Sequence, residues 1–237
     1  MTPHVQDHDH SRLIGRRAVA RGAAWSVPVV ALAVAAPANA ATYVSCAPGT
    51  LSWDNYAAGT NLLGKVLVPT GANLTGLTLS ITATGDTTAA NNGAVTSTTT
   101  GGQSKVLRFY DVNNKSNTSQ LVTITFSKPV QNLSFSLLDV DSQIGNFGAV
   151  AYEDLVTVVT AGWSGTRHAN VIGDGTPAHP YRAKNTNSPV AGSSADSNVD
   201  LVFAGPLSSV SFLYGQDGKV NGDPFIGISD LTFSYCH

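Results

Sequence analysis

The part of the sequence best suited to chemistry is a pair of aspartates, Asp139 and Asp141. They share the parity of Leu133, Phe135 and Leu137, so in a straight strand all five side chains would point to one face. Burying unpaired carboxylates in a hydrophobic core is costly. We therefore expect either that the strand ends or bends by Asp139, or that a cation balances the two charges.

Calcium is the cation that this region would bind. Glu153 and Asp154 follow after a glycine-containing loop and could return to the same corner as the aspartate pair. Clusters of carboxylate oxygens suit Ca²⁺, although the spacing does not match an EF-hand loop. The sequence predicts a Ca²⁺ site at Asp139, Asp141, Glu153 and Asp154. The alternative is that the aspartates are solvated or cap a turn.

A second candidate site combines aromatic and polar side chains. Trp163, Arg167, His168 and Tyr181 lie close together in the sequence, with His179 and Arg182 nearby. Sugars can stack on exposed aromatic rings, and jelly-roll domains include many lectins. These four residues are therefore the candidate ligand-binding set, to which Trp53 could contribute. The competing interpretation places both tryptophans in the core or at a corner.

Catalytic motifs find little support. Residues 162–165, Gly-Trp-Ser-Gly, lack the spacer residue of a Gly-x-Ser-x-Gly nucleophile elbow. Glycoside hydrolysis needs two carboxylates across a cleft. Glu153 is the sole glutamate, and its neighbour Asp154 would face the opposite way on a strand. We expect that the protein is not an enzyme, and a secreted hydrolase is the least favoured alternative.

Two cysteines, Cys46 and Cys236, lie near the two ends of the expected mature chain. An even count in an exported chain predicts a disulfide. The bridge would close a loop of about 190 residues and contribute roughly 5 kcal/mol in the chain-entropy model. It also implies that the first and last strands lie side by side. A lipoprotein anchor at Cys46 is the rival interpretation, and the residues before it fit that pattern poorly.

Residues 1–40 are typical of an export signal. Arginines at positions 16, 17 and 21 flank an uncharged stretch of about fifteen residues, and Ala-Asn-Ala at 38–40 matches a signal-peptidase site. The stretch is too short for a lasting membrane anchor. The paired arginines are similar to a twin-arginine signal, with the general secretory route as the alternative. We expect a protein that is secreted or held at the cell surface, with no membrane span in its mature chain.

The remaining segment, residues 41–237, has the length and composition of one extracellular domain. Removing the four basic and two acidic residues of the leader leaves nine Lys and Arg against thirteen Asp and Glu. This balance, with no basic patch, argues against nucleic-acid binding. Thr, Ser, Asn, Gly and Val are abundant, as in β-structure with many turns.

Short runs of alternating apolar residues, separated by turn signals, predict a β-sandwich or jelly roll. Two long loops are expected at residues 84–104, where 95–100 could form an edge strand, and 173–197. The predicted strands are Gly64–Val68, Leu77–Thr84, Val106–Val112, Leu121–Ser127, Gln131–Val140, Leu155–Ala161, Asn198–Ala204, Ser208–Gly215 and Ile228–Cys236.

An internal repeat is the most informative pattern. Residues 122–137 and 199–214 match at an offset of 77 residues, each with two alternating apolar stretches separated by a proline, Pro129 or Pro206. Alternation with period two places the apolar side chains on one face. Proline suits the end of a strand, where no ladder N–H is required. We expect two equivalent strand–corner–strand units that contribute to one core.

Three segments carry a resemblance to known proteins: Phe126–Phe135, Leu138–Asp141 and Tyr152–Val158. Together they resemble a β-sandwich module of exported bacterial surface and adhesin-like proteins, and the leader is similar to those of high-GC Gram-positive bacteria. The resemblance implies a jelly-roll-like sandwich with an extracellular binding or structural role. It carries no catalytic residues.

These observations predict a single antiparallel all-β sandwich, jelly-roll-like, whose termini are joined by a disulfide. The expected function is a non-catalytic, adhesin-like interaction or structural module, stabilised by Ca²⁺. Its expected partner is cell-wall, matrix or glycan material. The alternative function is a carbohydrate-binding module, which requires Trp163 or Trp53 to be exposed beside a groove.

Overall fold

The computed structural model describes residues 45–111, 118–145, 148, 150–218 and 224–236, so the expected leader lies outside the described residues. The described chain forms antiparallel strands and one short 3₁₀ helix, η2 (Trp53–Asn55). The strands are β1 (Cys46–Leu51), β2 (Leu79–Gly85), β3 (Ala94–Thr96), β4 (Val106–Tyr110), β5 (Thr118–Leu138), β6 (Ser142–Ile144), β7 (Val150–Val158), β8 (Trp163–Arg167), β9 (Val171–Ile172), β10 (Arg182–Ala183), β11 (Val199–Phe203), β12 (Leu207–Gln216), β13 (Phe225–Ile228) and β14 (Leu231–Cys236).

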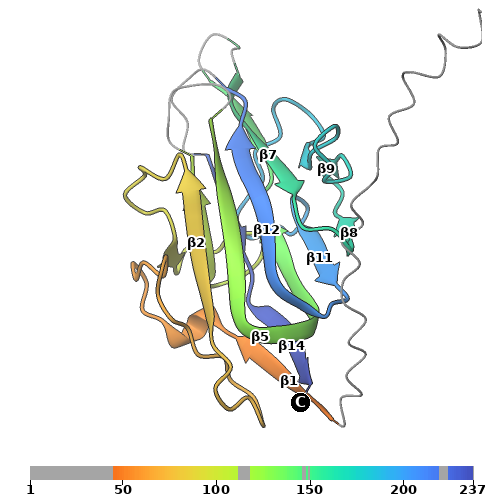
Figure 1. The fold of residues 1–237 in the computed structure, drawn as a ribbon. Coiled ribbons are helices and arrows are strands. Elements are labelled where there is room, and N and C mark those ends of the chain that lie inside the picture. Colours follow the sequence, from red (N-terminus) through yellow and green to blue (C-terminus); the bar gives the residue numbers. More distant parts are fainter. Residues whose placement is uncertain (1–44, 112–117, 146–147, 149, 219–223, 237) are drawn as a thin grey trace, which may run out of the picture. The chain divides into compact units, whose positions relative to one another are not determined.

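All strands except β9 and β10, which pair in a small separate sheet, build two curled sheets that share β5, a strand of 21 residues that bends from one sheet into the other (Figure 1). The first half of β5 lies between β2 and β12, and β7 follows β12. The second half lies between β11 on one side and β13 and β14 on the other. Beyond these, β8 pairs with β11, β4 with β13, and β1 with β14. The predicted all-β sandwich is confirmed.

The two copies of the internal repeat pair with each other crosswise. In one sheet β11 runs antiparallel to the second half of β5, with Leu201 opposite Phe135. In the other sheet β12 runs antiparallel to the first half of β5, with Phe212 opposite Val122. The first strand of each copy therefore meets the second strand of the other, in an approximate two-fold arrangement. This explains why both copies have the same apolar alternation.

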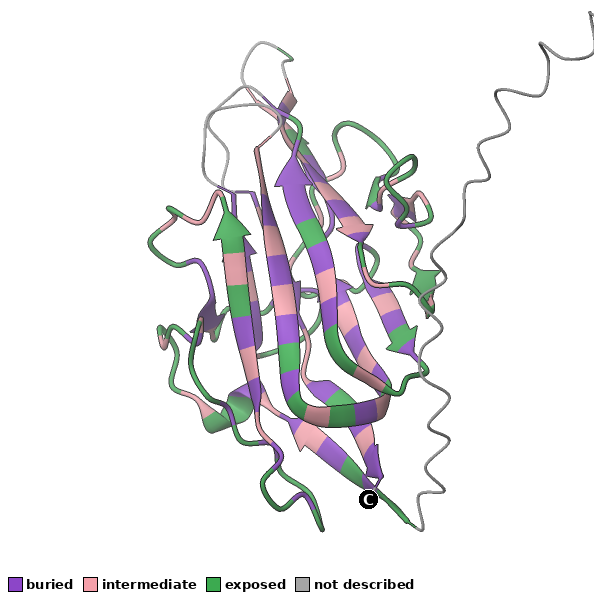
Figure 2. Ribbon diagram, in the orientation of Figure 1, coloured by how far each residue is buried: buried purple, intermediate pink, exposed green. Residues whose placement is uncertain are grey.

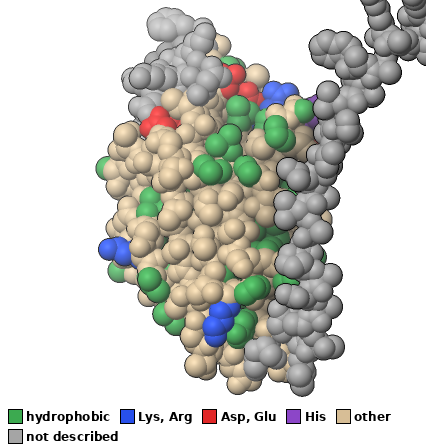
Figure 3. Space-filling view, viewed as in Figure 1, with side chains coloured by type: hydrophobic (Ala, Val, Ile, Leu, Met, Phe, Trp, Pro, Cys, Tyr) green, Lys and Arg blue, Asp and Glu red, His purple; other side chains and the backbone are tan. Residues whose placement is uncertain are grey.

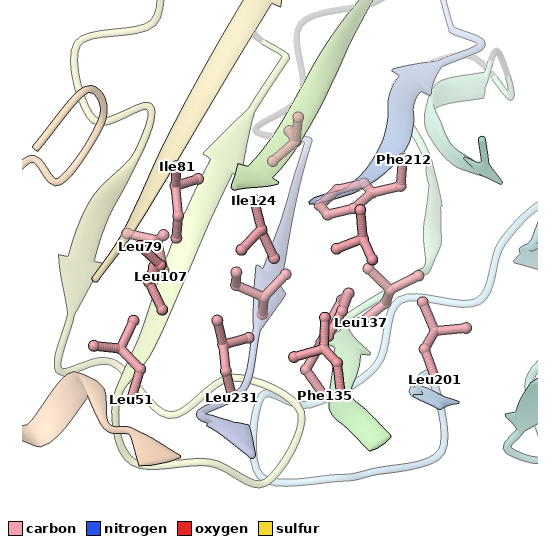
Figure 4. Close-up of a cluster of buried hydrophobic side chains, with 14 of the residues drawn as sticks. Leu51, Leu79, Ile81, Leu107, Ile124, Phe135, Leu137, Leu201, Phe212 and Leu231 are labelled. Atoms are coloured by element: carbon pink, nitrogen blue, oxygen red, sulfur yellow. The ribbon is translucent and has the colours of Figure 1, made fainter. Parts of the chain in front are cut away.

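The core lies between the two sheets, and both repeat copies contribute to it as predicted. Buried and exposed residues alternate along β5, β12 and β2 in Figure 2, and the inward side chains interdigitate in Figure 4. The Phe135 ring stacks on Phe203 and also contacts Phe212, with centroid distances of 6.0 and 6.3 Å. The buried repeat residues are Val122, Ile124, Phe126, Leu133, Phe135 and Leu137, and Val199, Leu201, Phe203, Val210, Phe212 and Tyr214.

The disulfide joins the ends of the domain as predicted. Cys46 and Cys236 are bonded and lie directly opposite each other in the β1–β14 ladder. This ladder pairs six residues of each strand, from Cys46 with Cys236 to Leu51 with Leu231. The covalent bond therefore closes the open end of a strand pair that the backbone already holds together.

Several predicted strand boundaries differ from the structure. The strands expected at Leu121–Ser127 and Gln131–Val140 are the single strand β5, because ladder pairing continues on both sides of the corner at Pro129. Within this corner Asn132 adopts a left-handed conformation with φ of 52°. Pro129 lies between Phe126, paired with Leu79, and Val130, paired with Leu207, so its missing N–H costs no regular ladder bond. The segment expected as a strand at Gly64–Val68 makes only isolated bridges to β2.

Candidate functional site

The aspartates after β5 are buried in an acidic cluster. The strand ends at Leu138, and Asp139 adopts a left-handed backbone conformation with φ of 67°. The predicted bend at Asp139 is therefore present. It does not expose the carboxylates, because Asp139 and Asp141 are 8% and 5% exposed and Asp154 of β7 is fully buried. We call Asp139, Asp141 and Asp154 the acidic cluster.

Hydrogen bonds from several elements hold the acidic cluster in place. The Tyr214 hydroxyl donates to Asp154 Oδ1 at 2.9 Å. The Val190 N–H donates to Asp141 Oδ2 at 2.9 Å, and the Tyr152 hydroxyl also hydrogen-bonds the Asp141 carboxylate. Because Tyr152 and Asp154 alternate with Glu153 along β7, both side chains reach the same face of the strand.

Burial raises the pKa of every carboxyl group in the acidic cluster, and the charge of Asp141 raises the pKa of Asp139 and Asp154 further. Desolvation raises the pKa of Asp139 to about 7, with a further increase from the charge of Asp141 and a partial offset from Arg108. Desolvation also raises the pKa of Asp141, and raises that of the fully buried Asp154 well above its usual value. The cluster therefore favours keeping protons that exposed aspartates would release.

Glu153, the fourth residue of the predicted calcium site, lies outside the acidic cluster. Its carboxylate Oε1 is 3.5 Å from Arg182 Nη1. Glu153 and Arg182 line a surface hollow to which none of the three clustered aspartates contributes. Among the described residues, no three His, Cys, Asp or Glu side chains are grouped in a way that could hold a metal ion. Calcium binding thus stays a prediction, and the three aspartates are the residues that would have to carry it.

The predicted ligand-binding residues mostly come together in a surface pocket beside β8. Trp163, Arg167 and Tyr181 line a pocket of about 320 Å³ together with Ser164, Gly165, Gly173 and Asp174. We call it the Trp163 pocket. Trp163 is half-buried at the start of the edge strand β8, and its ring meets the edge of Tyr181 at a centroid distance of 5.8 Å. Trp163 thus lines a surface pocket while part of its ring packs against the core, so it is less exposed than the carbohydrate-binding alternative expects.

The Trp163 and Tyr181 rings are held in position by close packing against the backbone at Gly175. Gly175 has a φ of 76°, and a Cβ atom there would lie 2.5 Å from the Tyr181 ring and 2.7 Å from the Trp163 ring. Only glycine fits this position without moving both aromatic side chains. Tyr181 is itself 2% exposed and pairs with Val156 of β7 through an isolated bridge. The pocket floor is thus tied to the sheet.

Polar groups at the rim of the Trp163 pocket are also fixed. Arg167 Nη1 donates to the Gly173 carbonyl at 2.6 Å. Asp174 Oδ1 accepts from the Thr176 hydroxyl at 2.7 Å and from the Thr176 N–H at 3.1 Å, and these hydrogen bonds lower the Asp174 pKa. Sequence reasoning missed Asp174. The Asp-Gly-Thr turn at 174–176 was the available signal, because aspartate commonly caps such a turn.

Two residues considered for ligand binding lie elsewhere. Trp53 is a core residue with no exposed surface, and its Nε1 donates to the Ile228 carbonyl at 2.9 Å. His168 follows β8 but does not line the Trp163 pocket; its Nε2 lies 3.1 Å from Asp200 Oδ2. Of the two tryptophans, Trp163 alone can therefore meet a ligand at this surface.

His168 also belongs to a chain of side chains that superficially looks catalytic. The Ser136 hydroxyl donates to Asp200 Oδ1 at 2.6 Å, and His168 contacts the other oxygen of the same carboxylate. In a nucleophilic triad the imidazole lies between the hydroxyl and the carboxylate, so that it can take the hydroxyl proton. Here the carboxylate occupies the middle position, and the His168 ring has no contact through which to activate Ser136.

The chain was compared with protein families, curated proteins and solved structures. No protein-family model, curated protein or solved structure matches this chain. Within the described part of the chain, no helix combines the length and the hydrophobicity needed to cross a bilayer.

Proposed function

We propose that this chain is an exported, non-catalytic binding module that takes a carbohydrate in the Trp163 pocket. The observation that carries the proposal is the convergence of Trp163, Arg167 and Tyr181, predicted from sequence as ligand residues, on one pocket with Asp174. The module would attach the protein to glycan-bearing cell-wall or matrix material, in an adhesin-like role. Export is supported by the sequence of the leader and is compatible with the disulfide.

The chemistry of the pocket fits a sugar. A half-exposed indole provides an apolar surface for the C–H face of a pyranose ring. Arg167 supplies N–H donors, and Asp174 supplies carboxylate acceptors, which together match the donor and acceptor character of neighbouring hydroxyl groups. Because its hydrogen bonds lower the Asp174 pKa, this acceptor stays ionised in mildly acidic surroundings.

One face of the domain carries few charges. Figure 3 shows that the face built by β2, β5, β12 and β7 is largely uncharged, with acidic side chains gathered toward its upper end. Nucleic-acid binding requires a basic surface that neutralises phosphates, and this face has no such cluster of Lys or Arg among the described residues.

The proposal is tested with the oxidised chain 41–237 on a broad array of glycans, followed by calorimetric titration of the best binder. We expect Trp163→Ala and Arg167→Gln each to weaken binding at least about tenfold, equivalent to ~1.4 kcal/mol. Lys65→Gln, an exposed cation outside the pocket, is the control and should bind normally. The glycan should be recovered intact after prolonged incubation.

Two results would overturn the proposal. The first is an absence of binding across the array by the folded, disulfide-bonded protein. The second is glycan binding that Trp163→Ala leaves unchanged, which would move the ligand to another surface. Release of shorter sugars during incubation would contradict the non-catalytic part.

A further inference from the structure

A second hollow adjoins the Trp163 pocket. It has a volume of about 380 Å³ and is lined by residues that include Glu153, Leu155, Pro180 and Arg182. We call it the Arg182 hollow. Both hollows are bounded by Gly173, so they lie on either side of the same short piece of backbone. Together they reach the size range typical of small-molecule ligand sites.

Gly173 is the residue that the two hollows share. Gly173 has a φ of 91°, and a Cβ atom there would collide with the Pro180 carbonyl oxygen. A side chain is therefore excluded at this position both by conformation and by space. The Gly173 carbonyl is occupied by Arg167, which holds the boundary in place. A ligand that reaches both hollows would therefore pass beside Gly173, where His179 of the Arg182 hollow and Asp174 of the Trp163 pocket lie 3.9 Å apart.

Both hollows contain an arginine and a carboxylate, and the Arg182 hollow also contains Asp217 and His179. Arg167 and Asp174 line the first, and Arg182 and Glu153 line the second, where the two charged groups are 3.5 Å apart. Each hollow thus combines cationic donors with carboxylate acceptors, which suits uncharged hydroxyl-rich groups better than an ion. Each also has an apolar surface, provided by Trp163 in the first and by Leu155 and Pro180 in the second.

A third hollow adjoins the Arg182 hollow. It has a volume of about 250 Å³, shares Leu155 and Pro180 with the Arg182 hollow, and extends over Pro177 and the half-exposed Leu213 of β12. The Arg182 hollow therefore adjoins both of the others, and all three are lined in part by the loop at residues 173–181. Such an arrangement fits a linear ligand made of similar units better than a single compact molecule.

We infer that the Trp163 pocket and the Arg182 hollow are adjoining subsites for a linear, uncharged oligosaccharide that crosses Gly173. This inference rests on the proposed function and specifies its ligand. One sugar unit contacts Trp163, Arg167 and Asp174. The next contacts Arg182 and Glu153, and further units extend over Pro180 toward β12.

The test uses three series of neutral oligosaccharides as probes, namely cello-, manno- and chito-oligosaccharides of one to six units, titrated calorimetrically into the oxidised chain 41–237. For the series that binds, we expect affinity to rise at least about tenfold from one unit to two or three, and then to level off. Arg182→Gln should remove this gain and leave the affinity for the single unit unchanged. Lys184→Gln, two residues away and also exposed, should behave like the unaltered protein.

The outcomes separate the inference from the proposed function. Affinity independent of chain length, abolished by Trp163→Ala and unaffected by Arg182→Gln, overturns the second subsite and leaves the module with a single-sugar pocket. Failure of all three series to bind overturns the subsite assignment. The proposed function is then tested separately by binding to the broad glycan array. Stronger binding of acidic oligosaccharides than of neutral ones contradicts the assignment of an uncharged ligand. Matching unfolding temperatures of the variants establish that each is folded.

Discussion

Asp141 and Asp154 are hydrogen-bonded to each other in both directions. The Asp141 N–H donates to Asp154 Oδ2 at 3.2 Å, and the Asp154 N–H donates to the Asp141 carbonyl at 3.0 Å. The backbone therefore holds the two residues together, and ionised carboxyl groups in this cluster cannot relieve repulsion by moving apart. Asp139, two residues away, adds a third carboxyl group with a raised pKa.

The acidic cluster should make the protein more stable at acidic than at neutral pH. The pKa of Asp139 is about 7 when folded against 3.8 in its reference state, so the folded chain binds this proton more tightly than the unfolded chain. The resulting stabilisation is complete below pH 4 and is lost as pH rises to 7. It amounts to about 4 kcal/mol, from 1.36 kcal/mol for each pKa unit. Urea unfolding at pH 5 and pH 8 should show about 3 kcal/mol of this loss, because about two of the pKa units lie above pH 5.

Asp139→Asn is the matched variant for this pH dependence. Asparagine has the same shape, is neutral, and tolerates the positive φ of 67° at this position. The variant should lose the share of the pH dependence that Asp139 contributes, while Asp141 and Asp154 keep theirs, and it should exceed the unaltered protein in stability at pH 8. Asp54→Asn, at an exposed aspartate outside the cluster, should follow the unaltered protein. Parallel pH curves for Asp139→Asn and the unaltered protein would contradict this explanation.

The calcium prediction is tested by the unfolding temperature at pH 7.5 in EDTA and in millimolar Ca²⁺. An ion that binds only the folded state stabilises it by mass action, so the prediction requires a rise of several degrees. The double variant Asp139→Asn and Asp141→Asn should abolish the rise. Glu153→Gln should retain it, because Glu153 pairs with Arg182 outside the cluster. Equal unfolding temperatures in both buffers would contradict calcium binding and indicate that bound protons neutralise the carboxyl groups of the acidic cluster.

The two tryptophans of the domain should respond differently to substitution. Trp53→Phe removes the hydrogen bond from Nε1 to the buried Ile228 carbonyl and should cost about 1–3 kcal/mol of unfolding free energy. Trp163→Phe should have little effect on stability, because its ring is partly exposed. In Trp53→Phe the remaining fluorescence comes from Trp163, and in Trp163→Phe it comes from Trp53. Acrylamide should quench the fluorescence of Trp53→Phe more strongly than the fluorescence of Trp163→Phe. Equal quenching would contradict the assigned exposures.

Reduction of the disulfide should substantially lower the free energy of unfolding. The hydrogen bonds of the β1–β14 ladder should still hold the two strands together in the folded state. Cys46 and Cys236 are 190 residues apart, and a loop of this length corresponds to roughly 5 kcal/mol in the chain-entropy model. The double variant Cys46→Ser and Cys236→Ser should show this loss in urea unfolding. Dithiothreitol should destabilise the unaltered protein and have no further effect on the double variant. An unchanged unfolding midpoint after reduction would contradict the prediction.

Sequence reasoning succeeded where the signal was local and periodic. The alternation along residues 122–137 and 199–214 predicted which side chains enter the core, because period-two patterning follows from strand geometry alone. The sequence-based prediction wrongly divided β5 into two strands at Pro129, because proline commonly ends a strand. Whether a proline ends or merely bends a strand depends on which neighbours take up the hydrogen bonds on either side. That information is not local.

By itself, the sequence determined the all-β class, the disulfide between Cys46 and Cys236, and the candidate residues at Asp139–Asp141 and around Trp163. Tertiary structure alone decided which candidates meet. Alternation on β7 brings Asp154 into the acidic cluster and turns Glu153 outward to Arg182. The loop at residues 173–181 folds back on β7 and adds Asp174 to the Trp163 pocket. The physical reason is that strand pairing and loop return join residues distant in sequence, whereas periodicity specifies only the face on which each side chain lies.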